Sequence, residues 1–456
     1  MRSVAVVGAG QAGLLTAHDL LRHGYKVTLF SDKTAEEFLT KARPTGTAAR
    51  FNMALDYERE LGLNYWDEEA PKGEGIHLTF SPAKGNRLLT LLGRFEKYFL
   101  AIDLRLQSHR WMVELEKKGG KVEIETVTLE RLDEIAGDHD LTIVAAGRGE
   151  IMQLFPRDEE RSVYSKPQRK LCMICTKGQP FAFPGTDLLP VKFNFFAPYG
   201  EAFWVPWFHK DIGPSWSMLF EAKAGGPIDR FDGVETGEQA VDIGREVIRD
   251  LMPWDYEWCR DMELLDENAW LKGGFTPEVR KVVGTLPSGR KVMSVGDTTM
   301  ALDPIGGQGA NNGNKMARNL VQCIVERGEE PYDEAWMAGT FERFWDRHRL
   351  INTFNNALLE PITNPGKELL IAQYGSTGST LDASGPQRIA NLFCANFDDP
   401  ASLSEAFFDM QAARAAIAAA TGRPAWRSAL RGRLAIAKGQ IRQKLGKPPG
   451  HPGTVG

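Results

Sequence analysis

Val4-Ala5-Val6-Val7-Gly8-Ala9-Gly10-Gln11-Ala12-Gly13, close to the start of the chain, is the stretch that decides the fold. Its apolar residues predict a short buried strand, and the G-x-G-x-x-G that follows predicts a tight turn into an amphipathic helix. Glycines at this turn let backbone amides at a helix N-terminus approach a pyrophosphate closely. Taken alone, the pattern fits many dinucleotide-binding proteins.

A second glycine-rich region lies far along the chain. Ser294-Val295-Gly296-Asp297 is followed by Asp303-Pro304-Ile305-Gly306-Gly307-Gln308-Gly309-Ala310-Asn311. FAD is long, and its ribityl chain and isoalloxazine ring need a contact surface beyond the adenosine site. The two regions together therefore indicate FAD rather than NAD, and a plain NAD dehydrogenase is the least favoured interpretation.

Two further turns extend the predicted cofactor site. An acidic residue near the end of the second strand of a βαβ unit typically holds the adenosine ribose. Asp32, directly after Ser31, is the candidate, with a solvated turn aspartate as the alternative. The apolar strand within residues 140–149 ends in a small-residue turn at Ala146-Gly147, as where a parallel strand meets a cofactor.

Size and composition place the chain among ordinary globular proteins. It has 456 residues, 42% of them hydrophobic and 25% charged, which is enough for two or three domains. A net charge of −5 argues against nucleic acid as a partner. No apolar run approaches the roughly 20 residues of a membrane span, and Met1-Arg2-Ser3 leads directly into the first strand without a signal peptide. We therefore expect a cytoplasmic protein.

The five cysteines make neither a disulfide framework nor a metal site. Cys172 and Cys175 form a C-x-x-C, but residues 171–175 look like a buried strand in which positions three apart point to opposite faces. No second cysteine pair completes a zinc site. We predict no metal.

Changes in pattern along the chain predict an α/β fold with an added antiparallel sheet and a helical C-terminal region. We assign residues 1–160 and 286–330 to a discontinuous FAD-binding domain and residues 161–285 to a substrate-binding β-sheet domain. Residues 331–410 form a helical region. Residues 411–456 form a basic helical tail whose last residues are disordered.

Aromatic residues in the predicted antiparallel sheet are candidates for a substrate pocket. They are Phe195, Phe203, Trp204 and Trp207. An apolar sheet face of this kind could roof a hydrophobic pocket, although core packing explains any one of these residues equally well.

The C-terminal tail has an unusual charge pattern. After Asp409 there is no acidic residue, while nine basic residues are spread over Arg414 to Lys447. The favoured interpretation is a solvated appendage, and docking to an anionic surface is the second one.

Several short motifs in this chain match one known family. The most specific are Lys166-Pro167-Gln168-Arg169, Gly296-Asp297, Asp303-Pro304 and Gly307 to Asn311; Arg43 with Thr47 and Asp103-Leu104-Arg105 match in type and place. Over residues 1 to about 400 the chain resembles the p-hydroxybenzoate hydroxylase-type flavoprotein monooxygenases. Within them it looks most like the two-component styrene and indole monooxygenases. The resemblance implies a Rossmann-like FAD-binding fold of the glutathione reductase/p-hydroxybenzoate hydroxylase type.

The resemblance also implies a reaction and a partner. FAD would arrive as FADH2 from a separate NAD(P)H:flavin oxidoreductase, by diffusion or transient contact. With O2 as co-substrate, a C4a-(hydro)peroxyflavin would epoxidise or hydroxylate an apolar aromatic or vinyl-aromatic small molecule. Single-component hydroxylases carry an Asp-Gly where this chain reads Ala146-Gly147-Arg148-Gly149, and its absence here favours the two-component group. A homodimer stays open.

The resemblance gives roles to the motif residues. Asp297 would contact the ribityl or pyrophosphate region. Pro304, Gly307, Gln308 and Asn311 would lie by the isoalloxazine at the oxygen-transfer site. The complete predicted cofactor-binding set is Gly8, Gly10, Gln11, Ala12, Gly13, Ser31, Asp32, Arg43, Thr47, Arg105, Ala146, Gly147, Gly296, Asp297, Pro304, Gly307, Gly309, Ala310 and Asn311.

One departure from the family weakens the substrate inference. Styrene monooxygenases usually carry Asn three residues after the arginine matched by Arg43, and this chain has Gly46 there, which we add to the predicted substrate pocket. Three alternatives remain: a flavin-dependent halogenase, a single-component aromatic hydroxylase, and a non-catalytic FAD carrier. The halogenase is disfavoured because the chain lacks W-x-W-x-I-P; Phe203-Trp204-Val205-Pro206-Trp207 is a superficial echo of it.

Overall fold

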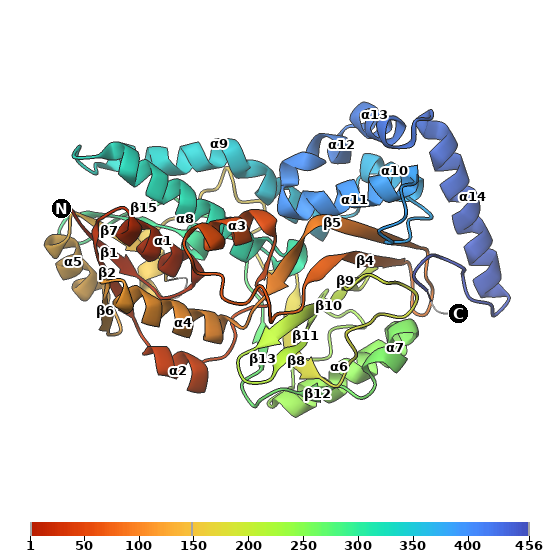
Figure 1. The fold of residues 1–456 in the computed structure, drawn as a ribbon, viewed down its shortest axis with the longest axis horizontal. Coiled ribbons are helices and arrows are strands. Elements are labelled where there is room, and N and C mark those ends of the chain that lie inside the picture. Colours follow the sequence, from red (N-terminus) through yellow and green to blue (C-terminus); the bar gives the residue numbers. More distant parts are fainter. Residues whose placement is uncertain (1, 147–148, 455–456) are drawn as a thin grey trace. The chain divides into compact units, whose positions relative to one another are not determined.

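The computed structural model describes residues 2–146 and 149–454, which form two compact units (Figure 1). Unit 1 comprises Met1–Glu68, Ile102–Gln168 and Phe275–Asn355. Unit 2 comprises Glu69–Ala101, Arg169–Gly274 and Asn356–Gly456.

Unit 1 is built on a largely parallel sheet with strand order β15-β16-β7-β1-β2-β6. These strands are β1 (Ser3–Val7), β2 (Lys26–Ser31), β6 (Lys121–Ile124), β7 (Leu141–Val144), β15 (Val283–Thr285) and β16 (Lys291–Ser294). β1 pairs in parallel with β2 and β7, β2 with β6, and β7 with β16, whereas β15 is antiparallel to β16. The predicted α/β dinucleotide-binding architecture is confirmed.

Two helices that follow the glycine-rich regions pack side by side in unit 1. They are α1 (Gln11–Arg22) and α8 (Gln308–Arg327) (Figure 1). α1 forms because Leu14, Leu15, Ala17 and Leu20 recur at helical spacing, and all four are buried. The packing of α1 on α8 brings the two motifs together although they are far apart in sequence.

The remaining elements of unit 1 connect or cover this sheet. They are α2 (Ala35–Thr40), β3 (Ala49–Arg50), α3 (Asn52–Glu60), α4 (Leu104–Lys117), α5 (Leu129–Asp138), η1 (Glu150–Leu154), β14 (Glu278–Val279), η2 (Gly296–Thr298), β17 (Met300–Ala301), η3 (Pro304–Gly306) and α9 (Glu334–Leu359). The end of α9, from Asn356, belongs to unit 2.

Unit 2 contains a mostly antiparallel sheet whose strands follow the order β12-β8-β11-β10-β9-β4-β5. They are β4 (Gly73–Ser81), β5 (Leu89–Ala101), β8 (Lys170–Lys177), β9 (Pro190–Phe196), β10 (Gly200–His209), β11 (Gly213–Ala222) and β12 (Glu263–Leu264), and β13 (Trp270–Gly273) also pairs with β8. The predicted antiparallel sheet and the hairpin between β9 and β10 are confirmed. β4 and β9 are parallel.

One segment lies in a different unit from the one we expected. Glu69–Ala101, which carries β4 and β5, was assigned to the FAD-binding domain but belongs to unit 2. β4 pairs with β9 over seven positions, from Gly75 with Pro190 to Ser81 with Phe196. An apolar strand fits either sheet, so its own sequence does not fix its partner. At the other end of the predicted sheet domain, residues 275–285 lie in unit 1.

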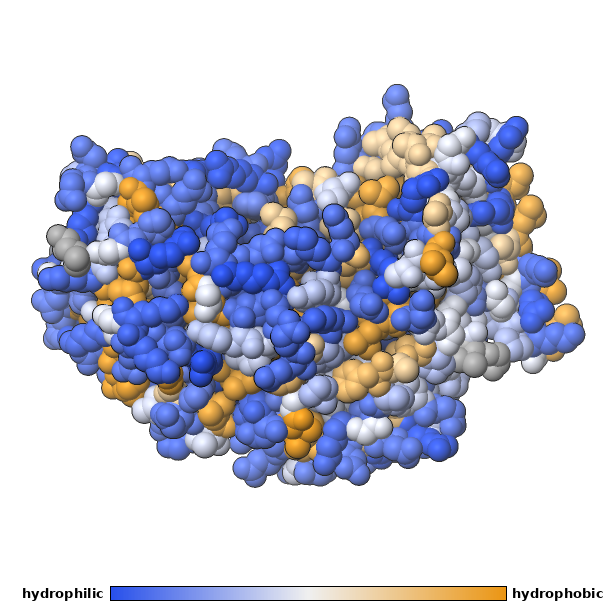
Figure 2. Space-filling model, in the orientation of Figure 1, coloured by the Kyte–Doolittle hydropathy of each residue, from blue (hydrophilic) through white to orange (hydrophobic). Residues whose placement is uncertain are grey.

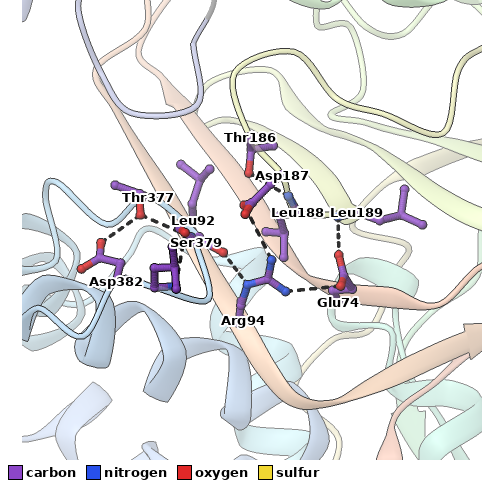
Figure 3. A network of polar contacts seen from close by, with 12 residues as sticks. Glu74, Leu92, Arg94, Thr186, Asp187, Leu188, Leu189, Thr377, Ser379 and Asp382 are labelled. Atoms are coloured by element: carbon purple, nitrogen blue, oxygen red, sulfur yellow. Dashed lines mark hydrogen bonds and ion pairs between the residues drawn. The ribbon is translucent and has the colours of Figure 1, made fainter.

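Polar contacts hold the edge of the unit 2 sheet (Figure 3). Arg94 of β5 lies between the carboxylates of Glu74 and Asp187, at N–O distances of 3.4 and 3.7 Å, and also donates to the carbonyl of Gly378. Glu74 in turn accepts from the backbone N–H of Leu189 at 2.8 Å. One arginine therefore ties β4, β5 and two loops together.

Helices complete unit 2. They are α6 (Gly237–Leu251), α7 (Pro253–Cys259), α10 (Asn364–Ala372), α11 (Gly385–Asp398), η4 (Pro400–Ser402), α12 (Ser404–Phe408), α13 (Met410–Thr421) and α14 (Ala425–Lys444). α6 and α7 pack on one face of the sheet around a core that includes Trp204, Trp216 and Phe220. None of the helices in the described residues is long and apolar enough to cross a membrane.

The C-terminal tail is more closely integrated than the appendage we expected. α14 packs on α10 and α13, and a Cβ on Gly432 would lie 2.0 Å from the carbonyl oxygen of Ile371. The end of the chain was expected to be disordered, but His451 is buried and the carbonyl of Pro452 accepts from the Thr90 hydroxyl at 2.8 Å. Small residues such as Gly432, rather than large apolar ones, pack α14 on α10. The composition of the tail therefore did not predict this packing.

Candidate active site

The carboxyl ends of four parallel strands gather the predicted cofactor residues of unit 1 at one edge. Gly8 follows β1, Asp32 follows β2, Ala146 follows β7 and Asp297 follows β16. Backbone hydrogen bonds of 2.8 to 3.0 Å continue past the strand ends, including Gly8 N to Phe30 O, Ala145 N to Val7 O and Val295 N to Val144 O. This edge is where ligands bind in open α/β sheets.

The three motif glycines at this edge have different environments. Gly8 has a φ of +118°, and a Cβ there would lie 2.7 Å from Ala145 O. A Cβ on Gly13 would lie 2.1 Å from Gly8 O. A Cβ on Gly10, in contrast, would meet no atom of the described residues within 4 Å. Gly8 and Gly13 are therefore required by the turn itself, whereas Gly10 borders open space.

That open space lies over the N-terminus of α1. Gly10 is the N-cap residue, no side chain caps the helix, and no acidic residue lies in its first turn. The first amides of a helix have no intrahelical acceptor and carry partial positive charge. The turn therefore fits the pyrophosphate of FAD.

Gly296 and Asp297 form the neighbouring turn. Gly296 has a φ of +68°, and a Cβ there would lie 2.8 Å from the Cβ of Ala12 in α1. Asp297 is exposed, yet desolvation by the surrounding protein raises the pKa of its carboxyl. Among the described residues, none forms a hydrogen bond or an ion pair with this carboxylate. A solvent-reachable carboxylate beside the N-terminal end of α1 fits the hydroxyls of a ribityl chain.

The Asp-Pro-Ile-Gly-Gly-Gln-Gly loop leads into α8. Asp303 caps η3 by accepting from Ile305 N at 3.1 Å, and Gly307, with a φ of +60°, is the N-cap of α8. A Cβ on Gly309 would lie more than 4 Å from every described atom, so the first turn of α8 also borders open space. The first turn of α8 has no acidic residue.

Gln308 and Asn311 direct their side chains into the protein. Both are buried, and the Gln308 amide donates to Gly306 O at 2.9 Å. Asn311 donates to Ala49 O at 2.8 Å and to Gly307 O at 2.7 Å, and accepts from Phe51 N at 2.8 Å. With these bonds Asn311 acts as a positioning residue that fixes the loop.

The other predicted cofactor residues of unit 1 vary in exposure. Ser31 is buried and donates its hydroxyl to Lys33 O at 2.7 Å, and Asp32 is exposed and paired with the Lys33 ammonium. Arg105 is buried and forms an ion pair with Asp103, with 2.8 Å between Nη2 and Oδ2.

Residues 41–48 and the turn after β7 complete the predicted set. Arg43 is exposed, Gly46 and Thr47 are half-buried, and a Cβ on Gly46 would meet no atom within 4 Å. Ala146 is half-buried, and Gly147 lies outside the described residues. Ala48, just after this segment, has a φ of +50°.

Sequence reasoning missed two supports of this site. The first is Asn355 of α9, which donates to Asp303 O at 3.0 Å. Its Oδ1 lies 2.4 Å from where a Cβ on Gly306 would be, so Gly306 has to be glycine. No local pattern links α9 to this loop, since the contact depends on how the helix packs.

The second support is a buried ion pair between Arg50 and Glu58. The pair is 2.6 Å apart and fully buried, and burial raises the pKa of Glu58. Asn314 of α8 donates to Glu58 Oε1 at 3.0 Å and accepts from Gln11 of α1. This network joins the beginnings of α1 and α8. The sequence signal for this buried pair was Glu58, a glutamate on the same side of α3 as Ala54.

The predicted pocket aromatics of unit 2 lie on two faces of its sheet. The rings of Phe193 and Phe203 stack with centroids 4.9 Å apart, and Phe195 stacks on Phe193 at 6.4 Å. Trp204 points to the opposite face, into the core under α6 and α7, where its indole N–H donates to Asp255 at 3.2 Å. The assignment of Trp204 to the pocket is therefore corrected, because neighbouring strand residues face opposite sides.

A buried ion pair lies on the same sheet face as Phe203. Arg169, the last residue of the Lys-Pro-Gln-Arg motif, is 2.7 Å from Glu201, and both are buried. Arg169 also donates to Leu359 O at 3.2 Å. Trp207 lies on this face by strand alternation, and its buried indole N–H meets no hydrogen-bond acceptor in the part of the chain that the structure describes.

Neither of the two side-chain groups that could suggest a metal forms a convincing site. Cys172 and Cys175 are buried cysteines on opposite faces of β8. His209, Asp211 and Asp266 lie close together, but His209 Nε2 bonds to Asp266 at 2.8 Å and Nδ1 accepts from Asp211 N at 3.2 Å. Both ring nitrogens of this histidine are thus already used.

Comparisons with known proteins find similarity to styrene monooxygenases. A family model described as "Styrene monooxygenase A putative substrate binding domain" matches residues 147–258. Styrene monooxygenase StyA from Pseudomonas fluorescens is 26% identical over 375 residues, covering 81% of this chain and 88% of the relative. StyA from a Pseudomonas species is 27% identical with the same coverage.

Solved structures of other proteins share the fold. A flavoprotein/dehydrogenase from Cytophaga hutchinsonii has a TM-score of 0.62 and 14% identity, covering 90% of this chain and 97% of that one. The halogenase PltM has a TM-score of 0.59 and 12% identity, covering 97% and 96%. At such identities these two structures show the fold alone. By these sequence comparisons the chain is similar to styrene monooxygenases, and its residues 147–258 match the model of their substrate-binding domain.

Proposed function

We propose that this chain is the oxygenase of a two-component system. It takes FAD already reduced by a separate NAD(P)H:flavin oxidoreductase and uses O2 to epoxidise or hydroxylate an aromatic or vinyl-aromatic compound. The observation that carries the proposal is the strand edge of unit 1. There, neighbouring turns carry open space at Gly10 and Gly309 and, at Asp297, a carboxylate that pairs with none of the described residues. FAD, when bound, supplies the oxygen-activating chemistry.

The residues of unit 1 would hold and polarise the cofactor. The α1 N-terminus binds the pyrophosphate, and Asp297 accepts from ribityl hydroxyls. The N-terminus of α8 stabilises negative charge on the pyrimidine end of the ring. Asn311 and Asn355 keep the intervening loop in place, so the amides of α8 need no rearrangement when charge develops.

The aromatic face of unit 2 supports an apolar substrate. Phe193, Phe195 and Phe203 form a stacked phenyl surface, and Glu201 on the same face is engaged by Arg169. Such a surface favours flat hydrocarbon rings by dispersion and by excluding water. Styrene-like and indole-like compounds are therefore the first substrates to test.

The external supply of electrons rests on the sequence. The chain has Ala146-Gly147-Arg148-Gly149 in place of the Asp-Gly of single-component enzymes, and no second G-x-G-x-x-G βαβ unit for a nicotinamide cofactor is evident. We expect the purified chain with FAD and substrate to oxidise NADH or NADPH negligibly.

Product formation under two electron supplies tests the proposal. Chemically reduced FAD, or NADH with any competent flavin reductase, should give O2-dependent oxygenated product from a panel of styrenes and indoles. Substrate-stimulated NAD(P)H oxidation by the chain alone would make it a single-component hydroxylase. Halogenated product in the presence of chloride or bromide would make it a halogenase. Hydrogen peroxide without product, as from free FADH2, would leave a flavin carrier.

A further inference from the structure

Helix α14 presents an apolar stripe to solvent. The exposed fractions are 61% for Trp426, 48% for Leu430, 64% for Leu434 and 60% for Ile441, and 68% for Leu445 directly after the helix. At about 100° per residue, these positions fall within one quadrant or so of the helix surface. At the place of α14 in Figure 1, apolar and hydrophilic surface alternate in the space-filling view (Figure 2).

The opposite side of α14 holds the helix to unit 2. Ser428, Ala429, Gly432 and Gly439 are buried there, and the helix packs on α10 and α13. The stripe is therefore a second apolar side of an already packed helix. Its length, from Trp426 to Leu445, is about 28 Å at 1.5 Å per residue.

Basic side chains flank the stripe. The same helical geometry puts Arg427, Arg431 and Lys438 along one border, and Arg433 and Lys444 along the other. Of these five, within the part of the chain that the structure describes, only Arg433 forms an ion pair, with Glu368 at 2.8 Å.

The net charge of residues 410–456 indicates what kind of partner α14 binds. Residues 410–456 contain nine lysines and arginines and no acidic residue. A second copy of this chain would bring an equally basic surface, so stripe-to-stripe pairing is opposed by like charge. A bilayer with anionic headgroups matches both features, because apolar side chains enter the acyl boundary while the basic borders meet phosphates.

We propose that α14 binds the surface of an anionic lipid bilayer, with the helix lying in the interface plane. A basic residue near such a surface raises affinity about fivefold. The inference stands independently of the proposed reaction. If that reaction is as proposed, membrane attachment would place the enzyme where apolar aromatic compounds partition.

Vesicle flotation of the full chain tests the proposal. At 0.1 M NaCl we expect at least tenfold stronger binding to phosphatidylcholine/phosphatidylglycerol (1:1) vesicles than to phosphatidylcholine vesicles. Raising the salt to 1 M should remove this difference, since the Debye length falls from about 10 Å to about 3 Å. Equal binding to both vesicles, or binding to neither, would overturn the proposal.

Two variants separate the apolar and the charged parts. Leu430→Ser/Leu434→Ser/Ile441→Ser should abolish flotation and keep the melting temperature, because all three side chains are exposed. Arg427→Gln/Lys438→Gln/Lys444→Gln should weaken binding to the mixed vesicles on the order of 100-fold, from about fivefold per charge.

A matched control and an oligomer measurement complete the test. Ile124→Ser/Val163→Ser/Leu381→Ser removes three exposed apolar side chains elsewhere and should float like the wild type. If this control loses binding as the α14 variant does, the stripe is not the site. A wild-type dimer that the α14 serine variant converts to monomer would instead identify a self-association surface and overturn the proposal.

Discussion

Replacing Gly10 with valine separates cofactor binding from folding at the first turn. Gly10 has φ −76° and ψ 175°, a conformation open to any residue, and its added Cβ would meet no atom of residues 2–146 or 149–454 within 4 Å. Gly10→Val should therefore leave the melting temperature of the apoprotein unchanged. The new side chain would occupy the space over the α1 N-terminus in which we place the pyrophosphate.

The expected loss follows from the hydrogen bonds that the valine would block. Two charge-assisted bonds from backbone amides to phosphate contribute about 1.5–3 kcal/mol each. Losing both weakens FAD binding by about 3–6 kcal/mol, or roughly 10²- to 10⁴-fold in Kd. Quenching of FAD fluorescence in a titration measures this Kd, and differential scanning fluorimetry measures the fold.

Gly13 provides the contrasting control. Its added Cβ would lie 2.1 Å from Gly8 O, so Gly13→Ala should lower the melting temperature of the apoprotein because the turn itself has to move. A folded Gly10→Val protein with wild-type FAD affinity would refute the placement of the pyrophosphate at this turn.

Three further predictions follow from single side chains. Asp297→Asn should weaken FAD binding about 10- to 100-fold without lowering apoprotein stability, because the carboxylate has no partner among the described residues; unchanged FAD affinity would contradict the ribityl contact. Burial lowers the pKa of His18 to about 4, so this imidazole takes up a proton at a higher pH in the unfolded chain than in the folded one. About 3 kcal/mol of the free energy of unfolding should therefore be lost as the pH falls from 6.5 to 4. His18→Gln should flatten that part of a denaturant-derived stability profile, and an unaltered slope would exclude His18 as its source. Glu201→Gln should cost about 3–5 kcal/mol by leaving the buried Arg169 guanidinium uncompensated, whereas Arg169→Met/Glu201→Leu should cost less than the sum of the single changes in a double-mutant cycle.

The parts of the fold that sequence predicts well are those fixed by local pattern. The strand, turn and helix around Gly8 to Gly13 are specified by neighbouring residues, and so is the hairpin between β9 and β10. Parallel strands share one carboxyl edge, so the placement of Asp32 and Asp297 at the same edge of the sheet also follows once the strands are identified. These are the residues for which the sequence argument needed no knowledge of distant contacts.

What escaped prediction depends on packing between distant segments. Asn355 meets the Asp303 loop only because α9 packs behind it, and β4 joins the unit 2 sheet through pairing that its own apolar residues do not specify. From sequence alone, Gly432 is expected to weaken its helix. In the structure, the absence of a side chain at Gly432 lets α14 approach α10. Trp204 is a different case, because adjacency to Phe203 in a strand already requires opposite faces.

That alternation also bears on the choice between oxygenation and halogenation. In a strand, a W-x-W spacing puts two indoles on one face, where they can act together. In β10 the two tryptophans are three positions apart, so Trp204 enters the core under α6 and α7 while Trp207 takes the face that carries Phe203. The Phe203-to-Trp207 segment therefore cannot present paired indoles to one site, although its sequence partly resembles W-x-W-x-I-P. Phe203 of this segment instead extends the stacked phenyl surface. The charges of Arg169 and Glu201 on the same face are paired with each other. Such a face suits a neutral aromatic ring that accepts an oxygen atom. The fold is shared with a solved halogenase, so the proposed oxygenation is supported by the sequence similarity to styrene monooxygenases, with which the spacing of the two tryptophans in β10 is consistent.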